Sequence, residues 1–163
     1  MKLKKILQVS MLAMTVVGIM TTPAFAESPK NTSVSEPSNI EMKTFSQIVE
    51  PLIGSSYVPG GKTEKGFDAS GFTQYVLNKK GIKIPRTTEE QRKEGATVEK
   101  LDIVEGDLVF FKTTDSDVQG SHVGISLGKN QVALVTIKKG VTIIDIEKDK
   151  FWSQQFVAAK RIN

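Results

Sequence analysis

Apolar residues are spaced three to four positions apart between residues 44 and 53, which predicts a short amphipathic helix. Thr44 and Gln47 form a capping-box pattern at its start, in which each side chain can accept the backbone N–H of the other residue. Pro51 lies inside the apolar stripe and is expected to kink or shorten the helix. The apolar positions are Phe45, Ile48, Val49, Leu52 and Ile53.

Two further helices are predicted before the middle of the chain. The first covers about residues 69–80, with Asp68 as its N-cap and Gly81 as the left-handed residue that ends it. The second is polar, begins after the capping residue Thr87 and extends to about Glu94. We expect this polar helix to lie on the surface in contact with solvent.

The pattern changes to strands in the second half of the chain. His122 falls on the face of its strand opposite Val123 and Ile125, because side chains alternate along a strand. Short turns between successive strands imply an antiparallel meander of about five strands, and helices followed by strands imply an α+β fold. The predicted strands cover residues 108–111, 121–127, 131–137, 141–146 and 156–161.

The N-terminal segment has the pattern of a secretory signal peptide. A basic start is followed by an apolar run from Ile6 to Met20, and small residues precede a predicted cleavage site after Ala26. An uncleaved membrane anchor is the alternative interpretation. Residues 27–42 are polar and contain two prolines, which predicts a flexible tether, and residues 43–163 are predicted to form one domain.

Charge and cysteine content exclude several kinds of function. Without residues 1–26 the chain has 19 Lys and Arg against 18 Asp and Glu, so we expect no nucleic-acid partner. After cleavage we also expect no membrane association, and we expect a monomer. The chain has no cysteine, which excludes disulfides, thiolate metal sites and cysteine nucleophiles. We predict no metal and no cofactor.

The stretch from Gly66 to Phe72 has the layout of a loop that presents one side chain at a helix N-terminus, where the field stabilises an anion. The residue presented is Ala69, which has no reactive group. Ser70 is rotated by about 100° around the helix from Ala69, so it is a poor substitute nucleophile. His122, the only histidine, is either a general base at a cleft or an incidental surface residue.

Several motifs, taken in order, resemble those of the NlpC-type cell-wall endopeptidases, which are secreted bacterial cysteine peptidases with a compact papain-like fold. The resemblance extends from about Phe45 to Ile162. The motifs are Tyr-Val-Pro-Gly-Gly at 57–61, Gly-Phe-Asp-Ala-Ser-Gly-Phe at 66–72, Pro-Arg-Thr-Thr with Gln91 at 85–91, Gly-Asp-Leu-Val-Phe-Phe at 106–111 and Ser-His-Val-Gly-Ile at 121–125.

The resemblance implies a catalytic triad of which one member remains. The nucleophile position is Ala69, the base position is His122, and the third position, which normally orients the base, is Leu134. An isobutyl group cannot accept a hydrogen bond from imidazole. Substrate-binding positions carried over from the family are Tyr57, Asp68, Ser70 and Ser121, while Pro59 replaces a tryptophan of the cleft wall.

Three hypotheses follow for the function of the chain. The first is a secreted, inactive NlpC-type domain at the cell wall or outside the cell, which binds peptidoglycan stem peptides or a cell-wall protein. The second is a peptidase that cleaves the stem peptide between D-Glu and a diamino acid by unrecognised chemistry. The third is a module that binds a ligand or protein unrelated to the wall, in a cleft made more apolar by Leu134.

Overall fold

The computed structural model describes residues 43–114 and 120–162. The predicted signal peptide over residues 1–26 and the tether over 27–42 lie outside the described residues, apart from the boundary at 43, and both stay predictions. Among the helices of the described residues, none combines the length and the hydropathy needed to cross a membrane.

The helices begin where their capping residues predict. α1 (Phe45–Val49) starts after Thr44, and the backbone N–H of Gln47 and the backbone N–H of Thr44 each bond to the other residue's side chain. Pro51 shortens this helix, because the chain continues as the 3₁₀ turn η1 (Glu50–Leu52). The other helices are α2 (Ala69–Lys79), α3 (Thr88–Lys93), η2 (Lys100–Asp102) and α4 (Trp152–Gln155).

The main sheet has six antiparallel strands in the order β3-β8-β4-β5-β6-β7. The meander from β4 to β7 is confirmed, but the last strand, β8, returns to pair with β4, and β3 pairs with β8 at the edge. The strands are β3 (Ala96–Val98), β4 (Leu108–Phe111), β5 (His122–Gly128), β6 (Gln131–Thr136), β7 (Gly140–Asp145) and β8 (Phe156–Arg161).

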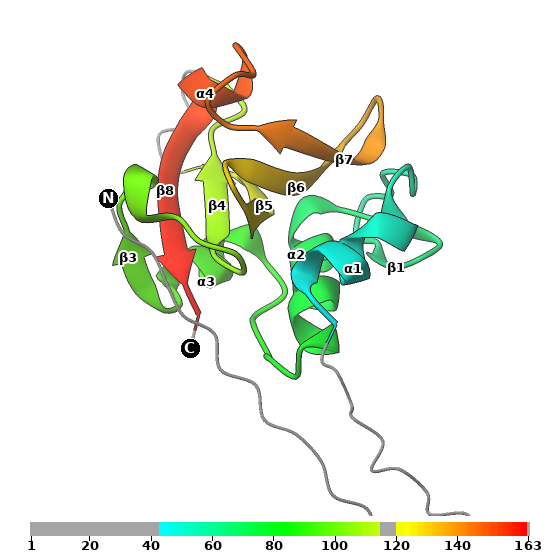
Figure 1. Ribbon diagram of the computed structural model, residues 1–163. Helices are drawn as coiled ribbons and strands as arrows, with labels where there is room; N and C mark the ends of the chain where they lie inside the picture. Colours follow the sequence, from blue (N-terminus) through cyan, green and yellow to red (C-terminus); the bar gives the residue numbers. More distant parts are fainter. Residues whose placement is uncertain (1–42, 115–119, 163) are drawn as a thin grey trace, which may run out of the picture. The chain divides into compact units, whose positions relative to one another are not determined.

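Each face of the sheet has its own hydrophobic cluster. α1 and α2 lie together beside one face (Figure 1), and the cluster beneath them includes Phe72, Phe110 and Val123. The second cluster includes Phe111 and Leu134, with Trp152 of α4 packed against it. The α+β fold is confirmed, with six strands instead of about five, because the sequence pattern did not reveal the short strand β3.

The polar helix α3 has one fully buried side chain. Gln91 is fully buried, and its amide nitrogen donates to the carbonyl oxygens of Ser70 and Pro85 at 3.0 and 2.8 Å. Its amide oxygen accepts the hydroxyl of Thr73 at 2.8 Å. The helix otherwise lies at the surface, as expected, and Gln91 ties it to the first turn of α2.

Candidate functional site

The N-terminus of α2 is held by close packing of glycines. The backbone N–H of Asp68 donates to the carbonyl of Gly61 at 3.0 Å. A Cβ atom on Gly71 would lie 2.1 Å from the same carbonyl oxygen, so only glycine permits this approach. The short strands β1 (Lys62–Thr63) and β2 (Gly66–Phe67) form a ribbon directly before the helix. The loop and the helix start therefore form one rigid turn.

Asp68 caps this helix and also binds a cation. Its Oδ1 accepts the backbone N–H of Gly71 at 2.7 Å, and its Oδ2 pairs with Nη2 of Arg86 at 2.6 Å. Burial alone would raise the pKa of Asp68, but the bonds from Arg86 and Gly71 and the charge of Arg86 outweigh it and lower the pKa. Asp68 is consequently ionised at neutral pH.

Ala69 and Ser70 occupy the first turn without presenting a reactive group. Ala69 is 9% exposed and packs in the hydrophobic cluster beneath α2. The Ser70 hydroxyl accepts Nη1 of Arg86 at 2.9 Å and lies 3.5 Å from Oδ1 of Asp68. The hydroxyl of Ser70 is thus engaged by the same ion pair that fixes Asp68. Sequence reasoning had not identified Arg86 as a residue of this site, although the motif that contains it was recognised.

His122 is half-buried, and its Nε2 atom is buried. Its ring stacks on the indole of Trp152, with ring centroids 5.3 Å apart and an interplanar angle of 28°. Nε2 is buried and has no hydrogen-bond partner among the described residues. Burial lowers the pKa of His122 from 6.5 to about 4, so the imidazole is neutral at pH 7. Trp152 was missed as a partner because it lies thirty residues away and belongs to a predicted connector.

Leu134 lies on the same face of the sheet as His122. Ile125 pairs with Ala133 across β5 and β6, which places Gly124 opposite Leu134 on the face that His122 shares. A Cβ atom on Gly124 would lie 3.0 Å from Cβ of Leu134, so glycine makes room for this side chain. Leu134 is fully buried in the second cluster. It therefore adds no apolar surface to a cleft, contrary to the expectation that it would.

A cavity of about 830 Å³ adjoins His122, and we call it the His122–Trp152 pocket. Of the predicted substrate-binding residues, Tyr57 lines it, while Ser121 is exposed with its Oγ 3.1 Å from Oγ1 of Thr113. Asp68 and Ser70 are instead joined by Arg86 at the helix start. The remaining lining residues are Thr113, Val135, Thr136, Ile137, Lys138, Lys139, Thr142, Ile143, Ile144, Asp145, Lys148 and Asp149.

Metal ligands are not grouped in the part of the chain that the structure describes. No three His, Cys, Asp or Glu side chains there are close enough together to hold a metal ion. The chemistry of the site rests on one neutral imidazole, one carboxylate–guanidinium pair and the pocket beside Trp152.

Comparison with known proteins gives a consistent result. The NlpC/P60 family profile matches residues 54–161. The gamma-DL-glutamyl hydrolase of Bacillus subtilis is 35% identical over 163 residues, 98% of this chain and 37% of that protein. The murein DD-endopeptidase and murein LD-carboxypeptidase MepS of Escherichia coli is 36% identical over 110 residues, 67% of this chain and 56% of that protein.

A solved structure agrees with these sequence matches. The crystal structure of an NlpC/P60 family protein from Bacillus cereus has a TM-score of 0.65 and 28% identity, covering 74% of this chain and 39% of that one. The chain spans less than two thirds of the length of each of these three proteins. The sequence motifs, the profile match and the shared fold lead to one conclusion: this chain belongs to the NlpC/P60 family.

Proposed function

We propose that this domain binds peptidoglycan stem peptides without cleaving them. One observation carries the proposal: Ala69 occupies the N-terminus of α2, where the family resemblance puts the nucleophile, and the chain contains no cysteine. Loss of a nucleophile lowers the rate of a covalent mechanism by several orders of magnitude. Thiolate attack on a peptide carbonyl is therefore not available to this domain.

The state of His122 supports the same proposal. A general base needs a pKa near the working pH, whereas burial gives His122 a pKa of about 4. A base also needs a partner that orients the ring, and Nε2 has no hydrogen-bond partner among the described residues. Leu134, at the position that the resemblance assigns to the orienting residue, offers no acceptor.

The surroundings of Asp68 and His122 support the binding of a peptide. Asp68 is ionised and fixed by Arg86, and Tyr57 and His122 line a pocket of peptide-accommodating size. The two relatives are named a hydrolase of gamma-DL-glutamyl bonds and an endopeptidase of murein. We infer from these names that the ligand is a glutamyl-containing peptide of the wall and that the protein acts at the wall or outside the cell.

The direct test is to incubate the whole chain with purified sacculi and to measure both sedimentation and released muropeptides. We expect the protein to pellet with the sacculi and to release no new product. If new products appear and vanish with His122→Ala or Ser70→Ala, the domain is a peptidase instead. If the protein stays in the supernatant, stem-peptide binding is wrong.

A further inference from the structure

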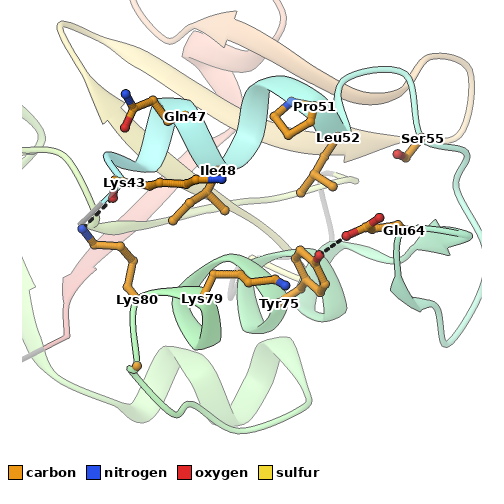
Figure 2. Close-up of a pocket in the computed structure, with 11 residues that line it drawn as sticks. Lys43, Gln47, Ile48, Pro51, Leu52, Ser55, Glu64, Tyr75, Lys79 and Lys80 are labelled. Atoms are coloured by element: carbon orange, nitrogen blue, oxygen red, sulfur yellow. Dashed lines mark hydrogen bonds between the residues drawn. The ribbon is translucent and has the colours of Figure 1, made fainter. Parts of the chain in front are cut away.

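Two cavities of nearly equal volume lie in the described part of this domain. They differ in which of their charged side chains have partners within the chain. Figure 2 shows the first, about 840 Å³, between α1 and the C-terminal half of α2. In this cavity Lys79 lies over the ring of Tyr75, and Lys80 lies over the ring of Phe45 and donates to the carbonyl of Lys43. Tyr75 in turn donates to Glu64. Lys79, Lys80 and Glu64 therefore have partners within the chain, whereas the ammonium of Lys43, which also lines this cavity, has none among the described residues.

In the His122–Trp152 pocket the acidic side chains are engaged and two cations are not. Asp145 pairs with Lys148 at 3.1 Å and also accepts two backbone N–H groups. Asp149 accepts the backbone N–H groups of Phe151 and Trp152, both at 3.0 Å, and so holds the turn that carries the indole. Both carboxylates therefore have structural roles in the wall of the pocket.

Lys138 and Lys139 are exposed at the β6–β7 turn, and both line the pocket. Within residues 43–114 and 120–162, neither ammonium group has an ion pair or a hydrogen bond with a side chain or carbonyl. Three lysines and two aspartates are among the described residues that line the pocket, so these side chains together carry a net positive charge. Such a wall favours an anionic ligand.

The rest of the lining suits a peptide. Trp152 and His122 form a flat, stacked pair along one side, and Ile137 at the turn is 81% exposed. An exposed apolar side chain beside an aromatic wall offers contact for methylene groups. A γ-linked glutamyl unit has two methylenes, two amide links and one free α-carboxylate, which matches an apolar wall flanked by cations.

We propose that Lys138 and Lys139 bind the free carboxylate of a γ-glutamyl peptide whose chain lies against the His122–Trp152 pair. This inference rests on the proposed function and names the ligand group that the domain recognises. Two sources supply such a group: a stem peptide of the wall and a free γ-glutamyl polymer. Both carry the same α-carboxylate, so the ligands used in the test have to distinguish them.

The single tryptophan makes the test specific to this pocket. Trp152 is the only Trp of the chain and lies in the pocket wall, so its fluorescence reports occupancy there. The whole chain is titrated with three synthetic probes: L-Ala-γ-D-Glu-L-Lys, the same peptide with its glutamate α-carboxylate amidated, and a γ-D-Glu oligomer. We expect the acidic tripeptide to bind and the amidated one to bind more weakly. The ratio of tripeptide to oligomer affinity identifies the source.

The matched variants place the same charge change in the two cavities. Lys138→Gln with Lys139→Gln is expected to weaken binding of the acidic probe about tenfold, because each rim ion pair contributes roughly a factor of three. Lys79→Gln with Lys80→Gln, in the cavity of Figure 2, is expected to leave binding unchanged. Addition of about 0.5 M salt shortens the Debye length to below about 5 Å and so screens charge interactions at the surface. We therefore expect the difference in affinity between the acidic and the amidated probe to decrease.

The possible failures are distinguishable. If the protein binds sacculi but the amidated and acidic probes bind equally, carboxylate recognition is wrong and the proposed function stands. Carboxylate recognition by Lys138 and Lys139 is also wrong if Lys138→Gln with Lys139→Gln leaves the affinity for the acidic probe unchanged. It is likewise wrong if Lys79→Gln with Lys80→Gln weakens binding of that probe instead. In both cases the proposed function stands. If neither the sacculi nor any probe binds, the proposed function fails and this inference fails with it.

Discussion

The imidazole of His122 stacks on the indole of Trp152, with 5.3 Å between the ring centroids. His122 starts β5, opposite Phe111 of β4, and Trp152 begins α4 after the turn that Asp149 holds. Phe111 also meets Trp152 edge to face at 5.2 Å. Among residues 43–114 and 120–162, the ring of His122 is therefore held by stacking on Trp152, and its Nε2 has no hydrogen-bond partner. This contact determines how the residue titrates and what a variant can change.

Stability should fall between pH 6.5 and pH 4 because of His122. Its pKa is about 4 in the folded chain and 6.5 when unfolded, so the unfolded chain binds more protons in this window. The free energy of unfolding is then largest above pH 6.5 and decreases as pH falls through the window, by about 3 kcal/mol at most. Urea unfolding at pH 7 and pH 4.5 measures the effect.

His122→Phe is the control for this titration. It keeps an aromatic ring beside Trp152 and removes the titrating group, so its unfolding free energy should change less between the two pH values. The charged residues that line the same pocket as His122 are Asp145, Asp149, Lys138, Lys139 and Lys148. Equal pH dependence in the wild type and the variant would show that His122 is not the group responsible.

Restoring two side chains should restore chemistry if the scaffold is still a peptidase cleft. Ala69→Cys supplies a thiol at the N-terminus of α2, where the helix field favours the thiolate. Leu134→His supplies an imidazole on the face of the sheet that carries His122. We expect the double variant to release muropeptides from sacculi and Ala69→Cys alone to be much slower. A matched variant, Ser70→Cys with Leu134→His, should stay inactive.

Removing the amide of Gln91 should destabilise the start of α2. Gln91→Leu leaves the carbonyl of Pro85 without its donor, and the carbonyl of Ser70 and the hydroxyl of Thr73 each lose one of their hydrogen bonds. We expect a loss of about 2–3 kcal/mol in the free energy of unfolding, since buried polar groups without partners are costly. Chemical denaturation provides the measurement, and Lys93→Leu, two residues further along α3 at an exposed position, is the surface control.

Asp107, directly before β4, is bonded to Arg161 of the neighbouring strand β8, and its loss should be costly. It is 1% exposed, accepts Nε and Nη2 of Arg161 at 2.9 and 2.8 Å, and accepts the backbone N–H of Val104. Asp107→Ala removes these bonds and is expected to lower stability by about 2–4 kcal/mol. Asp102→Ala at a neighbouring exposed position is the control, and thermal unfolding followed by circular dichroism compares the two.

Local signals predicted most of the secondary structure. The caps at Thr44, Asp68 and Thr87 depend on residues within a few positions of one another, so the sequence alone was sufficient to place three helix starts. The alternation around His122 likewise placed that residue on the correct face of β5. Strand β3 was missed because three residues carry too little pattern, and its pairing partner lies about sixty residues away.

The site was predictable in its residues but less so in its contacts. The motif resemblance named Ala69, His122 and Leu134, and the structure adds what surrounds them. Arg86 holds Asp68 and Ser70 through a side chain sixteen residues or more away in sequence, and Trp152 reaches His122 from α4. Such contacts depend on how whole helices and strands pack together, so they cannot be predicted from the periodicity of the sequence.

The close approach of Gly61 and Gly71 has a consequence for how such a domain changes over evolution. The glycines, Gln91 and the Arg86–Asp68 pair define the shape of the turn, whereas residue 69 only fills it. Shape and reactivity are therefore encoded by different positions. A substitution at residue 69 therefore leaves in place every contact that shapes the turn.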